Sequence, residues 1–250
     1  MSRSERIAGW LRDQATAANA RGFILGMSGG VDSAIVARLC QMAMPDRVLG
    51  VIMPCHSHPE DEADAMLAAE ASKLPVVRVD LSAAYDALAL DITAATSAER
   101  GHGFRPDAAR TKLALANVKP RLRMTTLYTI GMSLGFLVTG TGNRSEIAIG
   151  YYTKYGDGGV DLLPIGALVK SEVRALAREL GVPARIIDKP PSAGLWAGQT
   201  DESEMGFTYE DLEKYLDTGP ESVAPETAAR ILHLMNTSAH KRELPPVAPK

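Results

Sequence analysis

The most constraining feature of this sequence is the stretch Gly26–Ser33, which reads Gly-Met-Ser-Gly-Gly-Val-Asp-Ser. The apolar run before it, Phe23–Leu25, is typical of a buried strand. After it, Val36, Leu39 and Cys40 recur at helical spacing. The pattern therefore predicts a strand, a tight glycine turn and a helix, which is the building unit of an α/β fold.

The same turn carries the groups that a phosphate site needs. Adjacent glycines let the backbone pass close to a ligand, and the first turn of a helix offers unpaired N–H groups with a partial positive charge. Ser28 and Ser33 add hydroxyl donors, whereas Asp32 would repel a phosphate unless Mg²⁺ lay between them. We therefore expect a phosphate or pyrophosphate site with Mg²⁺. The alternative is a plain strand–helix turn with a capping Asp or Ser.

Two common nucleotide motifs do not match residues 26–33. A Walker loop has Lys after its last glycine, and the dinucleotide fingerprint has the spacing G-x-G-x-x-G. The string Ser-Gly-Gly-Val-Asp-Ser instead resembles the pyrophosphate loop of the ATP pyrophosphatases. That superfamily cleaves ATP between its α- and β-phosphates and adenylates a substrate.

Composition and charge narrow the possible partners. The 250 residues, 46% hydrophobic and 23% charged, suit one α/β domain over 1–250, and we expect a loose tail from about 244. The net charge of −3 gives no basic field, so we expect no nucleic-acid partner. Cys40 and Cys55 are expected to be free thiols of a cytoplasmic protein. We find no secretory-signal pattern and no apolar run of about 20 residues, and we expect no membrane association.

Strand and helix patterns alternate along the chain. Apolar runs predict strands at 23–25, 47–53, 76–79 and 136–139. Periodic segments predict helices at 4–20, after the glycine turn, at 59–74, 117–134 and 170–180, from 208, and at 224–238. This alternation favours a doubly wound parallel sheet with ligands at the carboxyl ends of its strands. The polar, glycine-bearing stretch 94–104 is expected to be a loop.

A second dense polar stretch lies at 151–161, with the sequence Tyr-Tyr-Thr-Lys-Tyr-Gly-Asp-Gly-Gly-Val-Asp. This composition is too irregular for a helix or a strand, and polar loops of this kind usually carry function. Another turn of the ligand-binding type, Gly140–Glu146, follows the fourth predicted strand.

Together these stretches resemble the ammonia-dependent NAD synthetase family, within the N-type ATP pyrophosphatase superfamily, from about Arg21 to Lys241. The resemblance rests on the phosphate loop, Lys119–Met124, Gly140–Asn143, Ser145–Glu146, Thr153–Asp161, Pro191–Gly194 and His240–Lys241. It implies a Rossmann-like adenine nucleotide alpha hydrolase (ATP pyrophosphatase) fold. It also implies a two-step reaction: the nicotinate carboxylate of deamido-NAD attacks the α-phosphate of ATP and releases pyrophosphate, and ammonia then converts the acyl-adenylate to NAD and AMP.

The resemblance also implies roles for individual residues. The ATP phosphates would be held by Gly26, Met27, Ser28, Gly29, Gly30, Val31, Asp32 and Ser33. Further ATP contacts would come from Thr141, Lys170 and Ser192. Mg²⁺ would be ligated by Asp32 and Glu146. Deamido-NAD would be contacted by Arg121, Lys154, Asp161, His240 and Lys241. The catalytic residues would be Asp157, Asp161 and Lys170, with Asp157 or Asp161 taking the proton of ammonium.

Each role has a simpler alternative. Glu146 is also compatible with an exposed acid in the first turn of a helix, and Lys170 and Arg121 with solvated helix charges. The pair His240–Lys241 is also compatible with plain surface near the chain end. Two alternative functions remain at this point. One is an enzyme that adenylates a different substrate, such as a GMP-forming or tRNA-modifying enzyme, and the other is a non-catalytic regulator that binds ATP. The net charge of −3 argues against a tRNA enzyme.

The expected ligands are ATP, deamido-NAD and ammonia, with Mg²⁺ as cofactor. We expect no amidotransferase domain within these 250 residues. If glutamine is the nitrogen source, a separate glutaminase would have to deliver the ammonia. The resemblance implies a homodimer with shared active sites. The helix at 117–134 and the C-terminal helix are our candidates for its interface.

Overall fold

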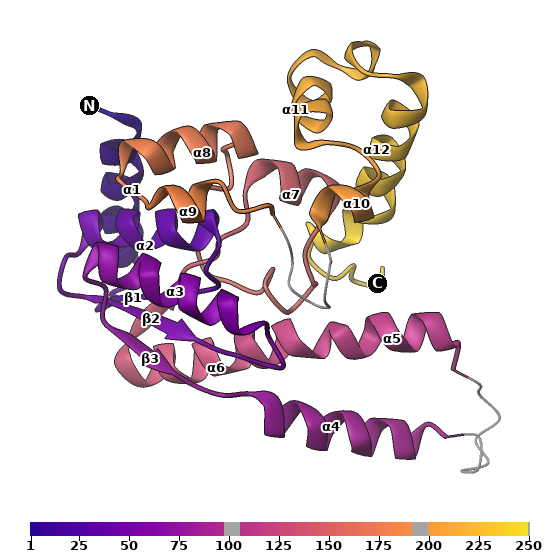
Figure 1. Cartoon of the computed structure of the whole chain (residues 1–250), viewed down its shortest axis with the longest axis horizontal. Coiled ribbons are helices and arrows are strands. Elements are labelled where there is room, and N and C mark those ends of the chain that lie inside the picture. The colour runs from indigo at the N-terminus through magenta and orange to yellow at the C-terminus, as the bar shows by residue number, and fades with distance from the viewer. Residues whose placement is uncertain (98–105, 192–199, 250) are drawn as a thin grey trace.

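A computed structural model describes residues 1–97, 106–191 and 200–249. Its centre is a parallel sheet in the order β3-β2-β1-β4 (Figure 1). The strands are β1 (Gly22–Gly26), β2 (Val48–Ile52), β3 (Val76–Arg78) and β4 (Phe136–Val138). The strand order reverses between β1 and β4, which creates a crevice at their carboxyl ends where α/β proteins bind ligands. The predicted doubly wound parallel sheet is confirmed.

Side-chain alternation along β1 divides the core into two layers. Phe23 and Leu25 belong to one buried cluster, whereas Ile24 lies in the other with Val51 and Val138. Successive strand side chains point to opposite faces, so a strand covered on both sides is apolar throughout. Both faces of β1 are therefore buried, and β1 delivers the phosphate loop from the middle of the sheet.

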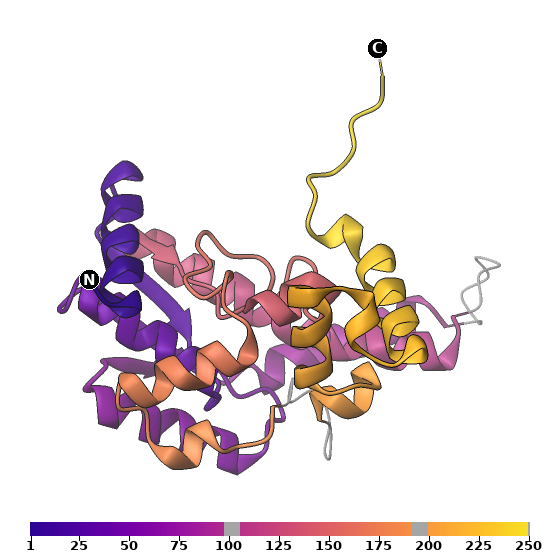
Figure 2. The same cartoon turned by 90° about the horizontal axis from the view of Figure 1, so that it is seen from above.

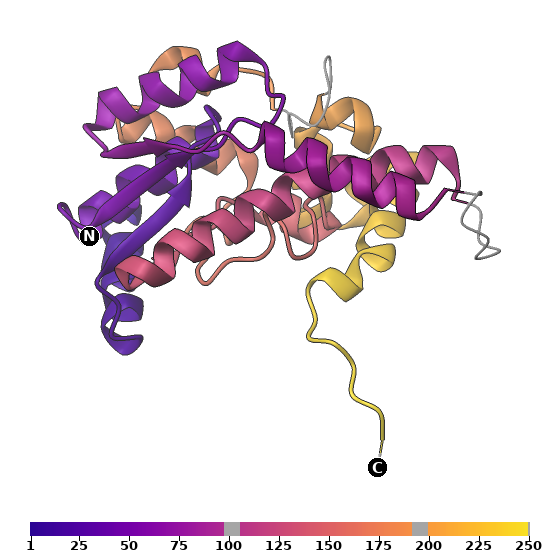
Figure 3. The same cartoon turned by 90° about the horizontal axis from the view of Figure 1, so that it is seen from below.

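Helices cover both faces of the sheet (Figures 1 and 3). The face of Phe23 is covered by α1 (Arg3–Ala17), α2 (Val31–Ala43), α3 (Pro59–Ser72), α8 (Lys170–Glu179) and α9 (Ala184–Ile187). The other face carries α6 (Val118–Leu134), beside which lie α4 (Ser82–Ala95) and α5 (Ala108–Ala116). The helix α3 begins at Pro59 and has three acids in its first turn, which suits the N-terminus of a helix.

The C-terminal helices form a third cluster beside the sheet (Figure 1). It contains α7 (Arg144–Ile149), α10 (Asp201–Met205), α11 (Tyr209–Thr218) and α12 (Pro225–Thr237), with 3-10 turns at 220–222 and 239–241. Ile149, Met205, Leu212 and Ile231 fill its centre.

The predicted helices and strands occur with boundary shifts of a few residues, but the stretch at 82–116 departs from expectation. The predicted loop 94–104 begins inside α4, which ends at Ala95, and positions 98–104 lie outside the described residues. The helices α4 and α5 reach beyond the sheet (Figure 3). No residue of α4 is buried, so an isolated sequence gives little packing signal there. Leu88, Leu90 and Ile92 of α4 are exposed.

The ends of the chain add two observations. The last described segment, 244–249, leaves the helical cluster (Figure 2), and its looseness stays a prediction. Among the helices of the described ranges, none has the length and apolar character needed to cross a membrane.

Candidate active site

The phosphate loop connects β1 to α2, as predicted. Gly30 is the N-cap of α2, and no side chain caps this helix within the described structure. The first-turn amides of α2 therefore lack the Asp or Ser cap that a plain strand–helix turn would use. Ser33 Oγ donates to the Gly30 carbonyl at 3.0 Å and lies 3.2 Å from Ser28 Oγ, so the two hydroxyls brace the loop.

Gly29 is the residue that lets α3 approach the loop. Its φ of +79° is rare for residues with a side chain. A Cβ at this position would lie 2.5 Å from the Asp61 carbonyl oxygen and 2.9 Å from Asp64 Cβ. The loop conformation and its contact with α3 therefore both depend on glycine.

A buried lysine joins the loop to two other helices. Lys170 Nζ lies 2.6 Å from Asp32 Oδ2 and 3.3 Å from Glu146 Oε1, and its residue is 2% exposed. The three residues stand in the first turns of α2, α7 and α8. The structure thus contradicts the alternatives in which Lys170 is a solvated helix charge and Glu146 is an exposed acid.

Asn143 fixes the two acids relative to each other. Its side chain donates to Asp32 Oδ1 at 3.1 Å, and its backbone N–H donates to Glu146 Oε2 at 3.2 Å in a capping box. Asn143 has no exposed surface. The capping of α7 therefore also sets the geometry of the acid pair.

Burial and charge shift the pKa values in this cluster. Desolvation raises the pKa of Glu146 to about 7, with Lys170 opposing the shift. Burial lowers the pKa of Lys170, but the charges of Asp32 and Glu146 outweigh this and hold it above its ordinary value. The ammonium is therefore charged and holds the two carboxyl groups together.

The acid pair fits a divalent cation whose remaining coordination positions are filled by a bound substrate. Asp32 and Glu146 side chains are 17% and 18% exposed, and a cationic group already lies between them. Among the described residues there is no group of three or more His, Cys, Asp and Glu side chains placed to hold a metal ion. Two carboxylates with substrate phosphates supplying the remaining oxygens is the arrangement that Mg²⁺ favours.

Two residues of the cluster escaped the sequence analysis. Asp201, at 4% exposure, accepts a hydrogen bond from the Tyr209 hydroxyl at 2.8 Å. The Tyr209 ring lies under Lys170, with its centroid 5.3 Å from Nζ. The only sequence signal was the position of each residue at the start of a helix, directly after Thr200 or Thr208.

The two candidate proton acceptors differ in their surroundings. Both oxygens of Asp161 accept hydrogen bonds, from the Tyr128 hydroxyl at 2.9 Å and from the Val138 N–H at 2.8 Å, so this side chain anchors its loop to β4. Asp157 Oδ1 accepts from Thr153 N–H at 2.9 Å. Desolvation by the surrounding protein raises the pKa of Asp157, although the residue as a whole is exposed. In these contacts Asp157 therefore uses one carboxylate oxygen, whereas Asp161 uses both.

Four of the residues expected to contact deamido-NAD are brought together. Arg121 donates to the Lys154 carbonyl at 3.4 Å, and Lys154 Nζ donates to the His240 carbonyl. Lys241 Nζ donates to the carbonyls of Gly150 and Tyr152, at 2.6 Å each. Of the remaining predicted contacts, Thr141 follows β4 and is half-buried, while Ser192 lies outside the described residues.

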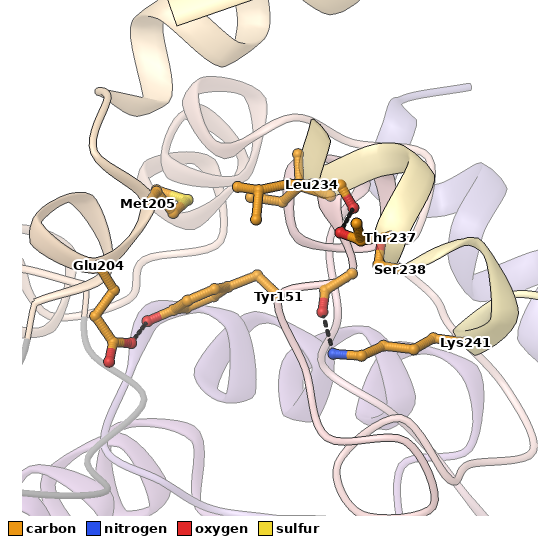
Figure 4. Close-up of a pocket in the computed structure, with 9 residues that line it drawn as sticks. Tyr151, Glu204, Met205, Leu234, Thr237, Ser238 and Lys241 are labelled. Carbon is orange, nitrogen blue, oxygen red and sulfur yellow. Dashed lines mark hydrogen bonds between the residues drawn. The ribbon is translucent and has the colours of Figure 1, made fainter. Parts of the chain in front are cut away.

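A cavity of about 260 Å³ adjoins Lys241 (Figure 4). It lies between the end of α7, α10 and α12, and Tyr151 crosses it to donate a hydrogen bond to Glu204. Leu234 and Met205 form its apolar wall. The cavity thus combines an apolar wall with a charged edge beside the group around Lys154 and His240.

The chain is similar to known proteins over almost its whole length. The family model "NAD synthase" matches residues 3–245. The NH(3)-dependent NAD(+) synthetase of Carboxydothermus hydrogenoformans is 52% identical over 245 residues, which are 98% of this chain and 96% of that protein. Among solved structures, NMN synthetase from Francisella tularensis matches with a TM-score of 0.89 and 34% identity, covering 99% of both chains. An NH3-dependent NAD synthetase from Campylobacter jejuni, in complex with nitrate, matches with a TM-score of 0.77 and 27% identity over 100% of both chains.

Proposed function

The chain belongs to the NAD synthase family, and we propose that it catalyses the ATP-dependent amidation of deamido-NAD to NAD with ammonia, releasing AMP and pyrophosphate. The observation that carries the proposal is the Asp32–Lys170–Glu146 cluster at the open first turn of α2. It provides acids for a cation, an ammonium group and backbone donors at one place. Phosphoryl transfer needs little else from a protein, because positioning and charge neutralisation supply most of the catalysis.

In the first step, an oxygen of the nicotinate carboxylate attacks the α-phosphorus and pyrophosphate leaves. The N–H groups of the phosphate loop and the Lys170 ammonium neutralise the departing phosphates. Asp32 and Glu146 would hold Mg²⁺, which spreads the negative charge of the phosphates when bound. The nucleophile belongs to the substrate, so the chain needs no serine or cysteine nucleophile.

In the second step, ammonia attacks the acyl carbon and AMP leaves. Only neutral ammonia is a nucleophile, so a base must remove the proton of ammonium. Asp157 is our candidate, supported by its raised pKa and its exposed position in the loop. Asp161 is the second choice, because both of its oxygens already accept hydrogen bonds.

The substrate would lie along the positive group formed by Arg121, Lys154, His240 and Lys241, which suits the phosphates of a dinucleotide. A cytoplasmic homodimer belongs to the same proposal, with deamido-NAD shared between subunits and a separate glutaminase as a possible source of ammonia. For the interface, the described structure adds the exposed apolar side chains of α4 and α5, among them Leu90 and Leu113, to the helices named from the sequence. Size-exclusion chromatography with light scattering measures the mass of the purified protein and so tests whether it is a dimer.

Membership of the NAD synthase family argues against a GMP-forming enzyme, a tRNA-modifying enzyme and a non-catalytic regulator. One second candidate is favoured by a specific observation: the TM-score of 0.89 with NMN synthetase from Francisella tularensis. In that case the substrate that is amidated would be the carboxylic-acid form of NMN (the acid mononucleotide) rather than deamido-NAD. The chemistry at the ATP site would be the same, and only the acceptor site would differ.

The test is a substrate panel with the purified full chain, ATP and Mg²⁺. We expect an amide product with deamido-NAD and ammonium, and a far lower kcat/KM with the acid mononucleotide. The reverse ranking would select the second candidate. Glutamine in place of ammonium should give no product, and hydrolysis of ATP without amide formation from either acceptor would contradict the proposal.

A further inference from the structure

One oxygen of Asp201 lies buried beside the active site without a partner. Oδ2 accepts from the Tyr209 hydroxyl, whereas Oδ1 has no hydrogen-bond donor within the described part of the chain. Tyr151 also lies close to this carboxyl group, but its hydroxyl donates to Glu204. A buried carboxylate oxygen without a donor is costly, so such an atom in a native site calls for an occupant.

The nearest cation is already engaged elsewhere. Lys170 makes ion pairs with Asp32 and Glu146 and none with Asp201, although the same Tyr209 side chain touches both Lys170 and Asp201. Asp32 and Glu146 are also the pair that fits a divalent cation. An ammonium group and a divalent cation repel each other strongly at contact distance in a site of low dielectric, so both cannot occupy one position.

The Lys170 side chain is enclosed by protein. Its side chain is 3% exposed, and a buried ammonium must keep a charged or polar acceptor. The Tyr209 ring can stay in contact with the ammonium through its π face as the group moves. Asp201, which accepts from the hydroxyl of the same ring, carries a buried oxygen, Oδ1, that has no donor among the described residues.

We propose that Asp201 is a positioning residue, which receives the Lys170 ammonium when a divalent cation takes its place between Asp32 and Glu146. The inference deepens the proposed function, since the metal site belongs to it. Lys170 then alternates between two positions: on the acid pair in the metal-free protein, and on Asp201 in the metal-bound protein. Asp201 thereby frees the metal ligands and keeps the ammonium inside the site.

The test measures Mn²⁺ binding to the full chain by electron paramagnetic resonance, in the absence of nucleotide and acceptor. Asp201→Asn keeps the shape and removes the charge that receives Lys170. We expect the Kd of Mn²⁺ to rise about 10-fold, which corresponds to an ordinary coupling between neighbouring groups. Lys170→Met removes the competing ammonium, so Mn²⁺ should bind more tightly than to the wild type.

The double variant separates this account from a simple loss of nearby charge. In the Lys170→Met background, Asp201→Asn should change the Kd less than about twofold, because no ammonium needs a receiver. An equal rise in both backgrounds, or no rise in either, would overturn the proposal. Glu221→Gln, an exposed acid of the turn at 220–222, is the control for charge and should leave the Kd of Mn²⁺ unchanged. Melting curves of the metal-free variants check that each one folds.

The outcomes also separate this inference from the proposed function. In one outcome, the wild type binds Mn²⁺ and makes NAD while Asp201→Asn has the same effect on the Kd with and without Lys170. That result would overturn only the role of Asp201. Wild-type protein that binds no Mn²⁺ would overturn the metal assignment, and the role of Asp201 with it. If Asp201 and Lys170 are coupled in Mn²⁺ binding but no NAD forms, the movement of Lys170 would stand and deamido-NAD would be rejected as the substrate.

Discussion

Lys170 Nζ lies 2.6 Å from Asp32 Oδ2, although the two residues are 138 positions apart in sequence. Glu146, from a third helix, contacts the same ammonium at 3.3 Å. All three residues stand in first turns, where the helix dipole is positive and favours acids and phosphates. The candidate site is therefore a meeting point of three helix N-termini at the carboxyl edge of the sheet.

Removing either acid of this pair should strongly impair catalysis while the fold persists. We expect Asp32→Asn and Glu146→Gln to lower kcat/KM by about 100-fold or more, because each leaves Lys170 with one acid and a metal with one ligand. Activity should also lose its dependence on Mg²⁺ concentration. Steady-state kinetics across a Mg²⁺ series measures both effects. The matched control is Glu226→Gln, an exposed first-turn acid of α12, and unchanged kinetics in Asp32→Asn would remove the metal assignment.

Gly29→Ala tests the fit between the phosphate loop and α3. The new Cβ would meet the Asp61 carbonyl at a backbone φ of +79°, so we expect a loss of about 1–3 kcal/mol in the free energy of unfolding and a higher KM for ATP. Gly9→Ala is the matched control. That glycine lies within α1 with no atom within 4 Å of a new Cβ, and the change should stabilise the protein by about 0.5–1 kcal/mol. Equal stability of the two variants would contradict the close approach at Gly29.

Local sequence patterns were enough to predict the sheet and the position of the phosphate loop. Buried apolar runs such as Phe23–Leu25 predict strands because both faces of a parallel sheet are covered. The burial of Lys170 and Asp201 could not be predicted, because it depends on contacts between α2, α7, α8 and α10 that are far apart in sequence. The helix α4 was missed for the opposite reason: with no buried residue, it shows no periodic apolar face.

Asp64 should be the most sensitive ion-pair position behind the phosphate loop. Its side chain is 4% exposed and lies 2.7 Å from both Arg185 Nε and Lys189 Nζ. Burial acts to raise the pKa of Asp64, but its hydrogen bonds to Lys189 and Arg185 outweigh this and hold the pKa below its ordinary value. Asp64→Asn should cost about 2 kcal/mol at pH 7, less than for a fully buried pair because both cations are partly solvated.

The pH dependence gives the sign of this effect. A carboxyl group with a lowered folded-state pKa stabilises the protein above its unfolded pKa, and the contribution disappears as pH falls through the folded value. The stability gap between wild type and Asp64→Asn should therefore shrink as urea unfolding is repeated at pH values below 4. Asp13→Asn, an exposed acid of α1, serves as the control and should show no such gap.

Glu146 should show the opposite pH dependence. Burial raises its pKa to about 7 in the folded state, above the unfolded value of about 4.3. The folded protein then binds more protons, so this contribution to stability is full below the unfolded pKa and is lost as pH rises through about 7. In metal-free protein, wild type should lose stability relative to Glu146→Gln between pH 5 and pH 8. Parallel stability curves for the two proteins would reject the raised pKa.

The most direct test of the acyl-adenylate mechanism follows the oxygen atoms of the acceptor. Deamido-NAD with both carboxylate oxygens labelled with ¹⁸O is incubated with the purified chain, ATP, Mg²⁺ and an ammonium salt, and the products are analysed by mass spectrometry. Attack on the α-phosphorus predicts AMP that carries one ¹⁸O, NAD that retains the other, and unlabelled pyrophosphate. Formation of ADP with labelled orthophosphate would contradict the mechanism, because it would place the attack at the γ-phosphorus.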